Sequence, residues 1–313
     1  MPITNNNVKV IDLPEVQILQ PLPANTAAGV CIVNDRRGTD EYIYYLSSAT
    51  SFWRYSVWAN TWQQLANPPA GGAFGAGTNM CYDPINGAIW LLLTSGTGAP
   101  GWHKYVIATN AWDAAKSVTN LPATFGTDSG IVFPNTAYHA SAPSNDYIYV
   151  IGNASTVLYR YQISTNAWIN TLTAQPSACG AGCDLAYVPA YNTGRIYRLR
   201  GATQATIDYY DIGGNSWTGV TYVPATETFA GGSNMKPRAG TTKAIVHKDN
   251  TGRLYELDLS DNSLTPLGTQ YVVANGAAVV GDKLAYVKET NGIEFLYKAV
   301  QTSNQFVRFA LVF

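Results

Sequence analysis

An asparagine recurs along the chain at nearly regular intervals, and each time a large apolar residue follows two positions later. Successive Asn residues are separated by 50, 56, 49, 47 and 42 positions. The six pairs are Asn60/Trp62, Asn110/Trp112, Asn166/Trp168, Asn215/Trp217, Asn262/Leu264 and Asn304/Phe306. A period of this size over most of a chain predicts one supersecondary unit repeated about six times.

Each Asn is preceded by a tyrosine, and the spacing between the two is always an odd number of residues. Tyr55, Tyr105, Tyr161 and Tyr210 stand five residues before their Asn, and Tyr255 and Tyr297 stand seven before theirs. In a strand of period two, both spacings place the ring on the same face. Asn tolerates positive φ, which two-residue hairpin turns require, so the sequence predicts a tight hairpin turn at each Asn.

Further strands are predicted around each of these turns. Runs rich in β-branched and aromatic residues precede the tyrosine segments, at 42–46, 89–93, 147–151, 196–199, 244–246 and 284–287. A less regular strand precedes most of them, as at 29–33 and 277–280, and the apolar residue after each Asn opens a fourth strand. Four short antiparallel strands in each of six units predict an all-β, six-bladed β-propeller. We place it at residues 26–313, behind an extended N-terminal arm of residues 1–25.

The corners Thr109-Asn110-Ala111-Trp112 and Thr165-Asn166-Ala167-Trp168 resemble those of kelch-type repeats, the repeats of galactose-oxidase-type propellers. The resemblance covers roughly residues 26 to 313. It departs at the end of the second strand, where kelch repeats carry a Gly-Gly doublet and this chain has Ser47-Ser48 and Thr94-Ser95. The resemblance implies a propeller that serves as a scaffold, an adhesin or occasionally an enzyme, and it does not choose among these roles.

Charged residues are scarce. They make up 12% of the chain, about half the usual share of roughly 25%. With 19 basic and 20 acidic residues and no Lys/Arg cluster, the composition argues against nucleic-acid binding. The start of the sequence shows neither a secretory signal nor a membrane-spanning run, so no membrane insertion is expected.

The segment 1–25 carries apolar residues (Val8, Val10, Ile11, Leu13) punctuated by prolines. Two readings are open for it. The segment adds as a strand to a neighbouring subunit, or it closes the ring against the final segment 305–313.

Catalytic and metal-binding motifs are weak. Of the four cysteines, only Cys179 and Cys183 lie close in sequence; reduced, buried thiols are the main interpretation and a disulfide in that loop the alternative. Three isolated histidines argue against a metalloenzyme, and no cofactor is expected. A sialidase-like site would use Asp128, Asp184, Arg198, Arg200, Glu227 and Arg238, but the sialidase repeat motif is missing, and Arg198 and Arg200 are interpreted as a polar strand face or solvated rim.

The recurring Trp62, Trp112, Trp168 and Trp217 are expected to pack between blades. A binding surface is instead predicted on the face formed by the Gly/Pro-rich interblade loops and the long loop before Trp102. Its candidate binding residues are Phe74, Trp102, Phe125, Asp128, Lys236 and Arg238, for which packing within loops is the competing interpretation.

Two functions from different classes follow. The first is a non-enzymatic virion component (tail, fibre or capsid-decoration subunit, with bacteriophage as the suspected source) that contacts other virion or surface proteins, in part through residues 1–25, or a host-surface glycan. It is motivated by a charge-poor surface on a chain with no export signal. The alternative is a carbohydrate-binding or carbohydrate-processing propeller, motivated by the abundance of Tyr and Trp.

Overall fold

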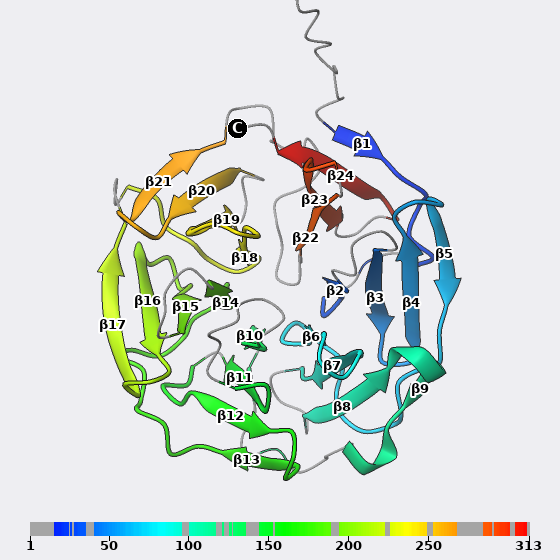
Figure 1. Ribbon diagram of the computed structural model, residues 1–313, viewed down its shortest axis with the longest axis horizontal. Helices are drawn as coiled ribbons and strands as arrows, with labels where there is room; N and C mark the ends of the chain where they lie inside the picture. The colour runs from blue at the N-terminus through cyan, green and yellow to red at the C-terminus, as the bar shows by residue number, and fades with distance from the viewer. Residues whose placement is uncertain are drawn as a thin grey trace, which may run out of the picture.

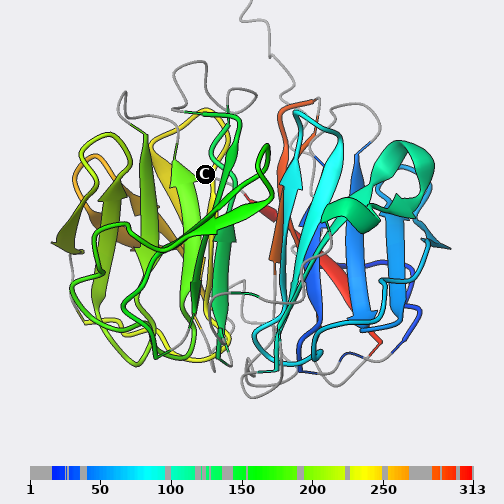
Figure 2. The same ribbon diagram turned by 90° about the horizontal axis from the view of Figure 1, so that it is seen from below.

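Six four-stranded antiparallel sheets form a closed ring around a central axis in the computed structural model, like the blades of a propeller (Figure 1). Figure 2 shows the same ring from the side, with the inner strands running along this axis. The structure describes residues 16–311 apart from 25, 27, 36–40, 96–99, 117–120, 122–124, 127, 136–143, 153, 189–193, 223–225, 249–252, 268–283, 290 and 301–303. The predicted all-β, six-bladed propeller is therefore confirmed.

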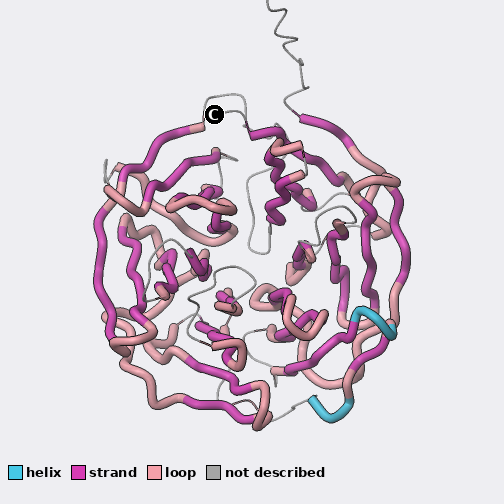
Figure 3. Tube along the Cα trace, in the orientation of Figure 1, coloured by secondary structure: helices cyan, strands magenta, loops and turns pink. Residues whose placement is uncertain are grey.

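The first five blades each take four consecutive strands, numbered from the centre of the ring outward. Their bounds are β2 (Cys31–Asn34), β3 (Tyr42–Ser48), β4 (Ser51–Ser56) and β5 (Thr61–Gln64); β6 (Asn79–Asp83), β7 (Ala88–Leu93), β8 (Gly101–Val106) and β9 (Ala111–Trp112); β10 (Ser129–Val132), β11 (Tyr147–Gly152), β12 (Tyr159–Gln162) and β13 (Ala167–Ile169); β14 (Asp184–Val188), β15 (Arg195–Leu199), β16 (Thr206–Asp211) and β17 (Ser216–Thr221); and β18 (Asn234–Pro237), β19 (Lys243–His247), β20 (Leu254–Asp258) and β21 (Ser263–Pro266). The helices in the described residues are two 3-10 turns, η1 (Ile107–Thr109) and η2 (Ala114–Lys116), drawn in cyan in Figure 3. Neither is long and apolar enough to cross a bilayer.

The sixth blade joins the two ends of the chain. It consists of β22 (Leu284–Lys288), β23 (Glu294–Ala299), β24 (Phe306–Leu311) and, outermost, β1 (Val16–Ile18). Val16 pairs with Phe309 and Ile18 with Val307, so for residues 16–18 the ring-closing reading is the correct one. Residues 1–15 lie outside the described part of the chain.

In the last repeat, the predicted strands were assigned one place too far from the centre of the blade. Phe306 opens the third strand of its blade and not the fourth, because β1 supplies the fourth. The run 284–287 is correspondingly the inner strand, and the strand predicted at 277–280 lies outside the described residues. A repeat that borrows its outer strand from the other chain end needs fewer residues, consistent with the short final interval of 42.

The Asn corners differ from the predicted two-residue turns. Asn60, Asn110, Asn166, Asn215 and Asn262 do adopt positive φ, between 46° and 61°. However, β4 ends at Ser56 and β5 begins at Thr61, and the other four corners have the same four-residue loop with Asn in its last position. Four-residue hairpin loops built around a type I turn are an established alternative to primed two-residue turns.

These corners also join neighbouring blades. The Asn110 Oδ1 accepts hydrogen bonds from Tyr105 Oη at 2.8 Å and from the Ala66 N–H at 2.9 Å, and Trp112 Nε1 donates to the Ala66 carbonyl at 2.9 Å. Ala66 follows the outer strand of the preceding blade, so one corner satisfies both peptide groups of a residue that has no strand partner there. The corners at Asn60 and Asn215 hold Gln20 and Thr173 in the same way. We call this arrangement the blade clamp.

Apolar packing between blades supplies the core. The hydrophobic clusters combine residues of neighbouring blades, as where Tyr55 and Trp62 of the first blade meet Phe306 of the sixth at ring-centroid distances of 5.0 and 5.1 Å. Trp62, Trp112, Trp168 and Trp217 all pack at the edges of such clusters, as predicted. Since a single four-stranded sheet cannot bury both of its faces, each blade depends on its neighbours.

Candidate functional site

A central cavity of about 340 Å³ lies on the axis of the ring and is lined by residues of all six inner strands, β2, β6, β10, β14, β18 and β22. Four aromatic residues are among those that line it, Tyr82, Phe133, Tyr187 and Tyr286, but their side chains are buried in the clusters between blades. Among the described residues, Lys236 and Arg238 are the charged side chains in the lining. Two of the six predicted binding residues, Lys236 and Arg238, therefore line the same cavity. They are two positions apart in the sequence, with Lys236 in β18 and Arg238 directly after that strand.

A polar collar stands at the interblade-loop end of the inner strands. It consists of their first residues in four blades: Asn79, Ser129, Asp184 and Asn234, all buried. Asn79 Nδ2 donates to the Ser129 carbonyl at 2.8 Å, and Asp184 Oδ2 accepts from the Met235 N–H at 3.0 Å, so both bonds cross between adjacent blades. None of the four collar residues lines the cavity.

Lys236 is held by this collar. Its Nζ lies 3.1 Å from Asp184 Oδ2 of the preceding blade. The positive charge of Lys236 is therefore balanced by the buried carboxylate of Asp184. Its ammonium group is a hydrogen-bond donor at the cavity wall, and the ion pair adds no net charge there.

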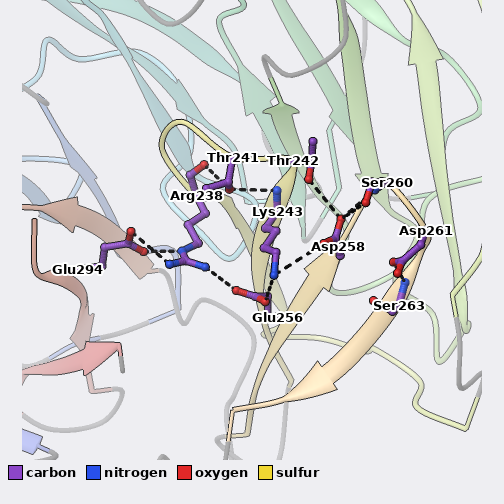
Figure 4. Close-up of polar contacts among 10 residues, drawn as sticks. All are labelled: Arg238, Thr241, Thr242, Lys243, Glu256, Asp258, Ser260, Asp261, Ser263 and Glu294. Atoms are coloured by element: carbon purple, nitrogen blue, oxygen red, sulfur yellow. Dashed lines mark hydrogen bonds and ion pairs between the residues drawn. The ribbon is translucent and has the colours of Figure 1, made fainter. Parts of the chain in front are cut away.

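Arg238 lies at the other end of β18, where the chain turns into β19, and so on the rim opposite the interblade loops (Figure 4). Its guanidinium bridges two blades: Nε lies 2.6 Å from Glu294 Oε2 on β23, and Nη1 lies 2.7 Å from Glu256 Oε2 on β20. Burial alone would lower the pKa of this guanidinium, but the hydrogen bonds and charges of the two carboxylates raise it above its usual value. Arg238 therefore stays charged and fixed.

The network continues outward from the cavity along the surface of the fifth blade (Figure 4). Lys243 Nζ lies 2.5 Å from Glu256 Oε1 and 3.7 Å from Asp258 Oδ2. The hydrogen bond to Glu256 raises the pKa of the Lys243 ammonium group. Within the described residues, no group of three or more His, Cys, Asp or Glu side chains is arranged to hold a metal ion.

The other four predicted binding residues, on the interblade-loop face, are packed against the rest of the protein: Phe74, Trp102, Phe125 and Asp128. Trp102 is fully buried and stacks on Trp90 at 5.5 Å between ring centroids, and Phe125 is fully buried in the same cluster. Phe74 is half-buried against the first two blades. These rings pack the fold, which is the competing interpretation, and Trp102 and Phe125 present no surface to a partner.

Asp128 connects two interblade loops. Its Oδ2 accepts a hydrogen bond from the Gly182 N–H at 3.0 Å. Gly182 has φ +86°, and a Cβ there would lie 1.8 Å from the Ala230 carbonyl oxygen of the following interblade loop. The glycine-rich composition of these loops is thus explained by close approach between successive loops, with no ligand required.

Arg198 was predicted to lie on a polar strand face or a solvated rim, and the structure corrects this. Its side chain is fully buried and is ion-paired with Asp208, also fully buried, whose other oxygen lies 2.7 Å from Arg200 Nη2. Arg198 Nη1 also donates to the Ser177 carbonyl at 2.9 Å. Asp208 was missed by sequence reasoning, although its position opposite Arg198 in the register of β15 and β16 places the two together. This pair does not meet Arg238, which has separate partners, so the residues of a sialidase-like site are dispersed.

All four cysteines are buried and none of them forms a disulfide, in agreement with the main interpretation. Cys179 contacts the Arg198 guanidinium at 3.5 Å. A hydrogen bond from Cys183 and, after it, the charge of Arg198 lower the pKa of the Cys179 thiol, against the effect of burial.

The exposed large apolar side chains of the described residues are few: Ile18 at 75% exposure, Trp58 at 69% and Ile85 at 44%. Trp58 lies in the corner loop of the first blade that bonds to the sixth, because the Gln20 N–H donates to Asn60 Oδ1 at 2.9 Å. This seam is at the upper right of Figure 1, where β1 meets the end of β4 and the start of β5. Ile18 pairs with Val307, which packs toward the fifth blade, so its side chain lies on the other face of the sixth blade. Sequence reasoning did not single out Trp58 as an exposed residue.

Comparisons with known proteins add support for the fold alone. No protein-family model matches the chain, and no curated protein sequence matches it. Among solved structures it is similar to that of U3-55K, with a TM-score of 0.61 and 12% sequence identity over 95% of this chain and 98% of that one. At this identity the similarity extends to the β-propeller and no further.

Proposed function

We propose that this chain is a non-enzymatic structural or interaction subunit, and that it is a component of a virus particle such as a tail, fibre or capsid-decoration protein. The β-propeller fits an interaction role, because a ring closed by its own two chain ends is a rigid body that can present surfaces on its rims and perimeter. The charge-poor composition, with 12% charged residues, motivates a particle-exposed location.

The observation that carries this proposal is the exposure of Trp58 at the seam between the first and sixth blades. Among the described residues, the exposed large apolar side chains are Ile18, Trp58 and Ile85, and Trp58 is the aromatic one. Exposed tryptophan is a frequent anchor in protein–protein interfaces, because its large ring loses much hydrated surface on contact. An assembly role accounts for a tryptophan that is exposed to solvent at this seam.

The experiment is to purify particles from the source of this chain, detect the protein with an antibody, and compare wild type with Trp58→Ser. We expect wild-type protein in the particles and loss of the Trp58→Ser variant from them. Ile85→Ser is the matched control, since it also removes an exposed apolar side chain but lies in the second blade, between β6 and β7. Absence of the wild-type protein from purified particles would refute the virion assignment.

The central cavity favours a second candidate, the binding of a carbohydrate. Lys236 and Arg238 line it and provide hydrogen-bond donors for sugar hydroxyl groups. Glycan-array screening followed by calorimetry tests this idea with Lys236→Met, which keeps much of the side-chain volume and removes the donors. A glycan whose affinity is unchanged in that variant would not be bound in the cavity.

A further inference from the structure

Two cysteines lie together beneath the surface of one interblade loop. Cys179 and Cys183 stand between the third blade and the first strand of the fourth, and both belong to the same buried cluster. Cys31 and Cys81 lie in two other clusters. Cys183 shares a hydrogen bond with the Cys179 sulfur, so the two side chains are in direct contact. The fold therefore places two thiols where one can react with the other.

Close packing of the loop keeps these two thiols in contact. The Cys183 N–H donates to the Gly180 carbonyl at 3.1 Å, which closes a tight turn between the two cysteines. A Cβ on Gly180 would lie 2.1 Å from the Cβ of Ala202, and a Cβ on Gly182 would lie 1.8 Å from the Ala230 carbonyl oxygen. The neighbouring loops thus hold the turn from two sides, and glycine is the residue that fits at both positions.

A buried guanidinium contacts the sulfur of Cys179. Arg198 Nη1 lies 3.5 Å from Cys179 Sγ, and the same nitrogen donates to the Ser177 carbonyl at 2.9 Å. The ion pair with the buried Asp208 holds Arg198 in this position. A cation beside a sulfur atom favours the thiolate, and the thiolate is the form of cysteine that attacks an oxidant.

The cysteines accordingly differ in their tendency to ionise. The hydrogen bond from Cys183 lowers the pKa of the Cys179 thiol, and the charge of Arg198 adds to this effect against the opposing influences of burial and of Asp208. Burial instead raises the pKa of the Cys81 thiol well above its usual value. A larger fraction of Cys179 than of Cys81 is therefore thiolate at neutral pH.

The two thiols also lie close to solvent. Both cysteines are buried, but Ala178 beside Cys179 is exposed, and Ala181 in the turn between them is partly exposed. The cover over the sulfur atoms is thus a surface loop of small residues. A small oxidant needs only a slight displacement of this loop to reach them.

We propose that Cys179 and Cys183 form a redox-sensitive site that hydrogen peroxide converts into a disulfide. The Cys179 thiolate attacks one peroxide oxygen; an S–O bond forms, the O–O bond breaks, and the departing hydroxide takes up the proton that Cys179 lost on ionisation. The Cys183 thiol then attacks the Cys179 sulfur; an S–S bond forms, the S–O bond breaks, and hydroxide leaves as water with the Cys183 proton. Two electrons pass from the thiols to the peroxide, which ends as two water molecules.

The experiment treats the folded full chain with hydrogen peroxide, blocks the remaining thiols with iodoacetamide and measures the masses of the tryptic peptides. Residues 161–194 contain neither lysine nor arginine, so both cysteines fall on one peptide, whereas Cys31 and Cys81 fall on two others. We expect this peptide to lose two hydrogen atoms, reversibly with dithiothreitol. The loss should be at least about tenfold faster than oxidation of Cys81, because of the larger thiolate fraction.

Two serine variants test the roles of the two sulfur atoms. Cys183→Ser removes the attacking thiol of the second step, so Cys179 should persist as a sulfenic acid that dimedone traps. Cys81→Ser is the matched control and should form the disulfide at the wild-type rate. Oxidation of all four cysteines at one rate in the folded wild-type chain, or a peptide that keeps two blockable thiols while Cys81 is oxidised or after prolonged exposure to peroxide, would overturn the proposal.

This inference goes beyond the proposed function, because the two cysteines belong neither to the seam at Trp58 nor to the lining of the central cavity. The particle experiment compares variants at other positions. The virion assignment and the redox site can therefore fail separately.

Discussion

Replacement of Asn110 by glycine and by alanine separates two contributions of this residue to the stability of its blade clamp. These are its hydrogen bonds and its tolerance of the left-handed backbone conformation. The residue has φ 50° and ψ 45°, in the left-handed region, and its Oδ1 accepts hydrogen bonds from Tyr105 and from Ala66. A net hydrogen bond is worth about 1 kcal/mol, and left-handed backbone costs a residue with a Cβ about 1 kcal/mol. Glycine removes only the hydrogen bonds, whereas alanine removes the bonds and adds the backbone cost.

We therefore expect Asn110→Gly to lower the free energy of unfolding by about 2 kcal/mol and Asn110→Ala by about 3 kcal/mol. Asn110→Asp keeps the accepting oxygen and should cost less than about 1 kcal/mol at neutral pH. Urea denaturation followed by tryptophan fluorescence measures the midpoint and slope for each variant.

The exposed neighbour Thr109→Ala serves as the control, with an expected change within about 0.5 kcal/mol. Equal stabilities of the glycine and alanine variants would show that positive φ carries no cost at this corner. A glycine variant as stable as wild type would show that the bonds to Tyr105 and Ala66 contribute nothing, and the clamp interpretation would fail.

Four further predictions concern other parts of the ring. Asp208→Ala should cost about 3–5 kcal/mol in urea denaturation, because it leaves the buried guanidinium of its partner uncompensated; a smaller cost would mean that water or another carboxylate reaches that site. Burial, followed by the charge of Lys298, holds the pKa of His247 well below its usual value, so the unfolded chain binds a proton that the native state does not. Stability should accordingly fall as pH drops below about 6.5, by up to about 1.4 kcal/mol per pH unit, and His247→Gln should remove this part of the pH dependence. Trp102→Ala should destabilise by about 3–5 kcal/mol, since the ring is fully buried, and a variant that unfolds at the wild-type urea concentration would contradict this packing. Deletion of residues 1–15 should leave the melting temperature unchanged while deletion of 1–20 lowers it, because only the longer deletion removes β1 from the sixth blade; equal melting temperatures would argue against ring closure by β1.

The tyrosine spacing illustrates how far sequence reasoning reached into the fold. The parity of five and seven residues placed the rings on one face, and Tyr255 does share a cluster with Leu257. The spacing did not reveal that Tyr105 donates to its Asn, because that bond depends on a four-residue loop and the loop length depends on the strand ends. Period and face are local properties, whereas the length of a hairpin loop is fixed by the pairing register of two strands.

The candidate site was less accessible to such reasoning. Lys236 and Arg238 were selected from the sequence and do line the central cavity, but their partners Asp184 and Glu294 come from blades on either side. Trp102 was selected because it breaks the repeat near a long loop, and it is buried by Trp90 of its own blade and Trp168 of the next. Trp58 breaks the repeat equally and is exposed. Exposure depends on which neighbours the closed ring brings to a residue, and a single sequence does not contain that information.

The sequence by itself determined the number of repeats, the β-strand character of each and the position of the corner asparagines. These follow from a period near 50 residues, from alternating apolar residues and from the rare tolerance of asparagine for positive φ. Only the tertiary structure decided that β1 completes the sixth blade, that the corners bond to the preceding blade, and that Arg198 is paired inside the protein. Each of these is a contact between residues far apart in the chain, and such contacts form only when the ring closes and removes the apolar faces of all six blades from water.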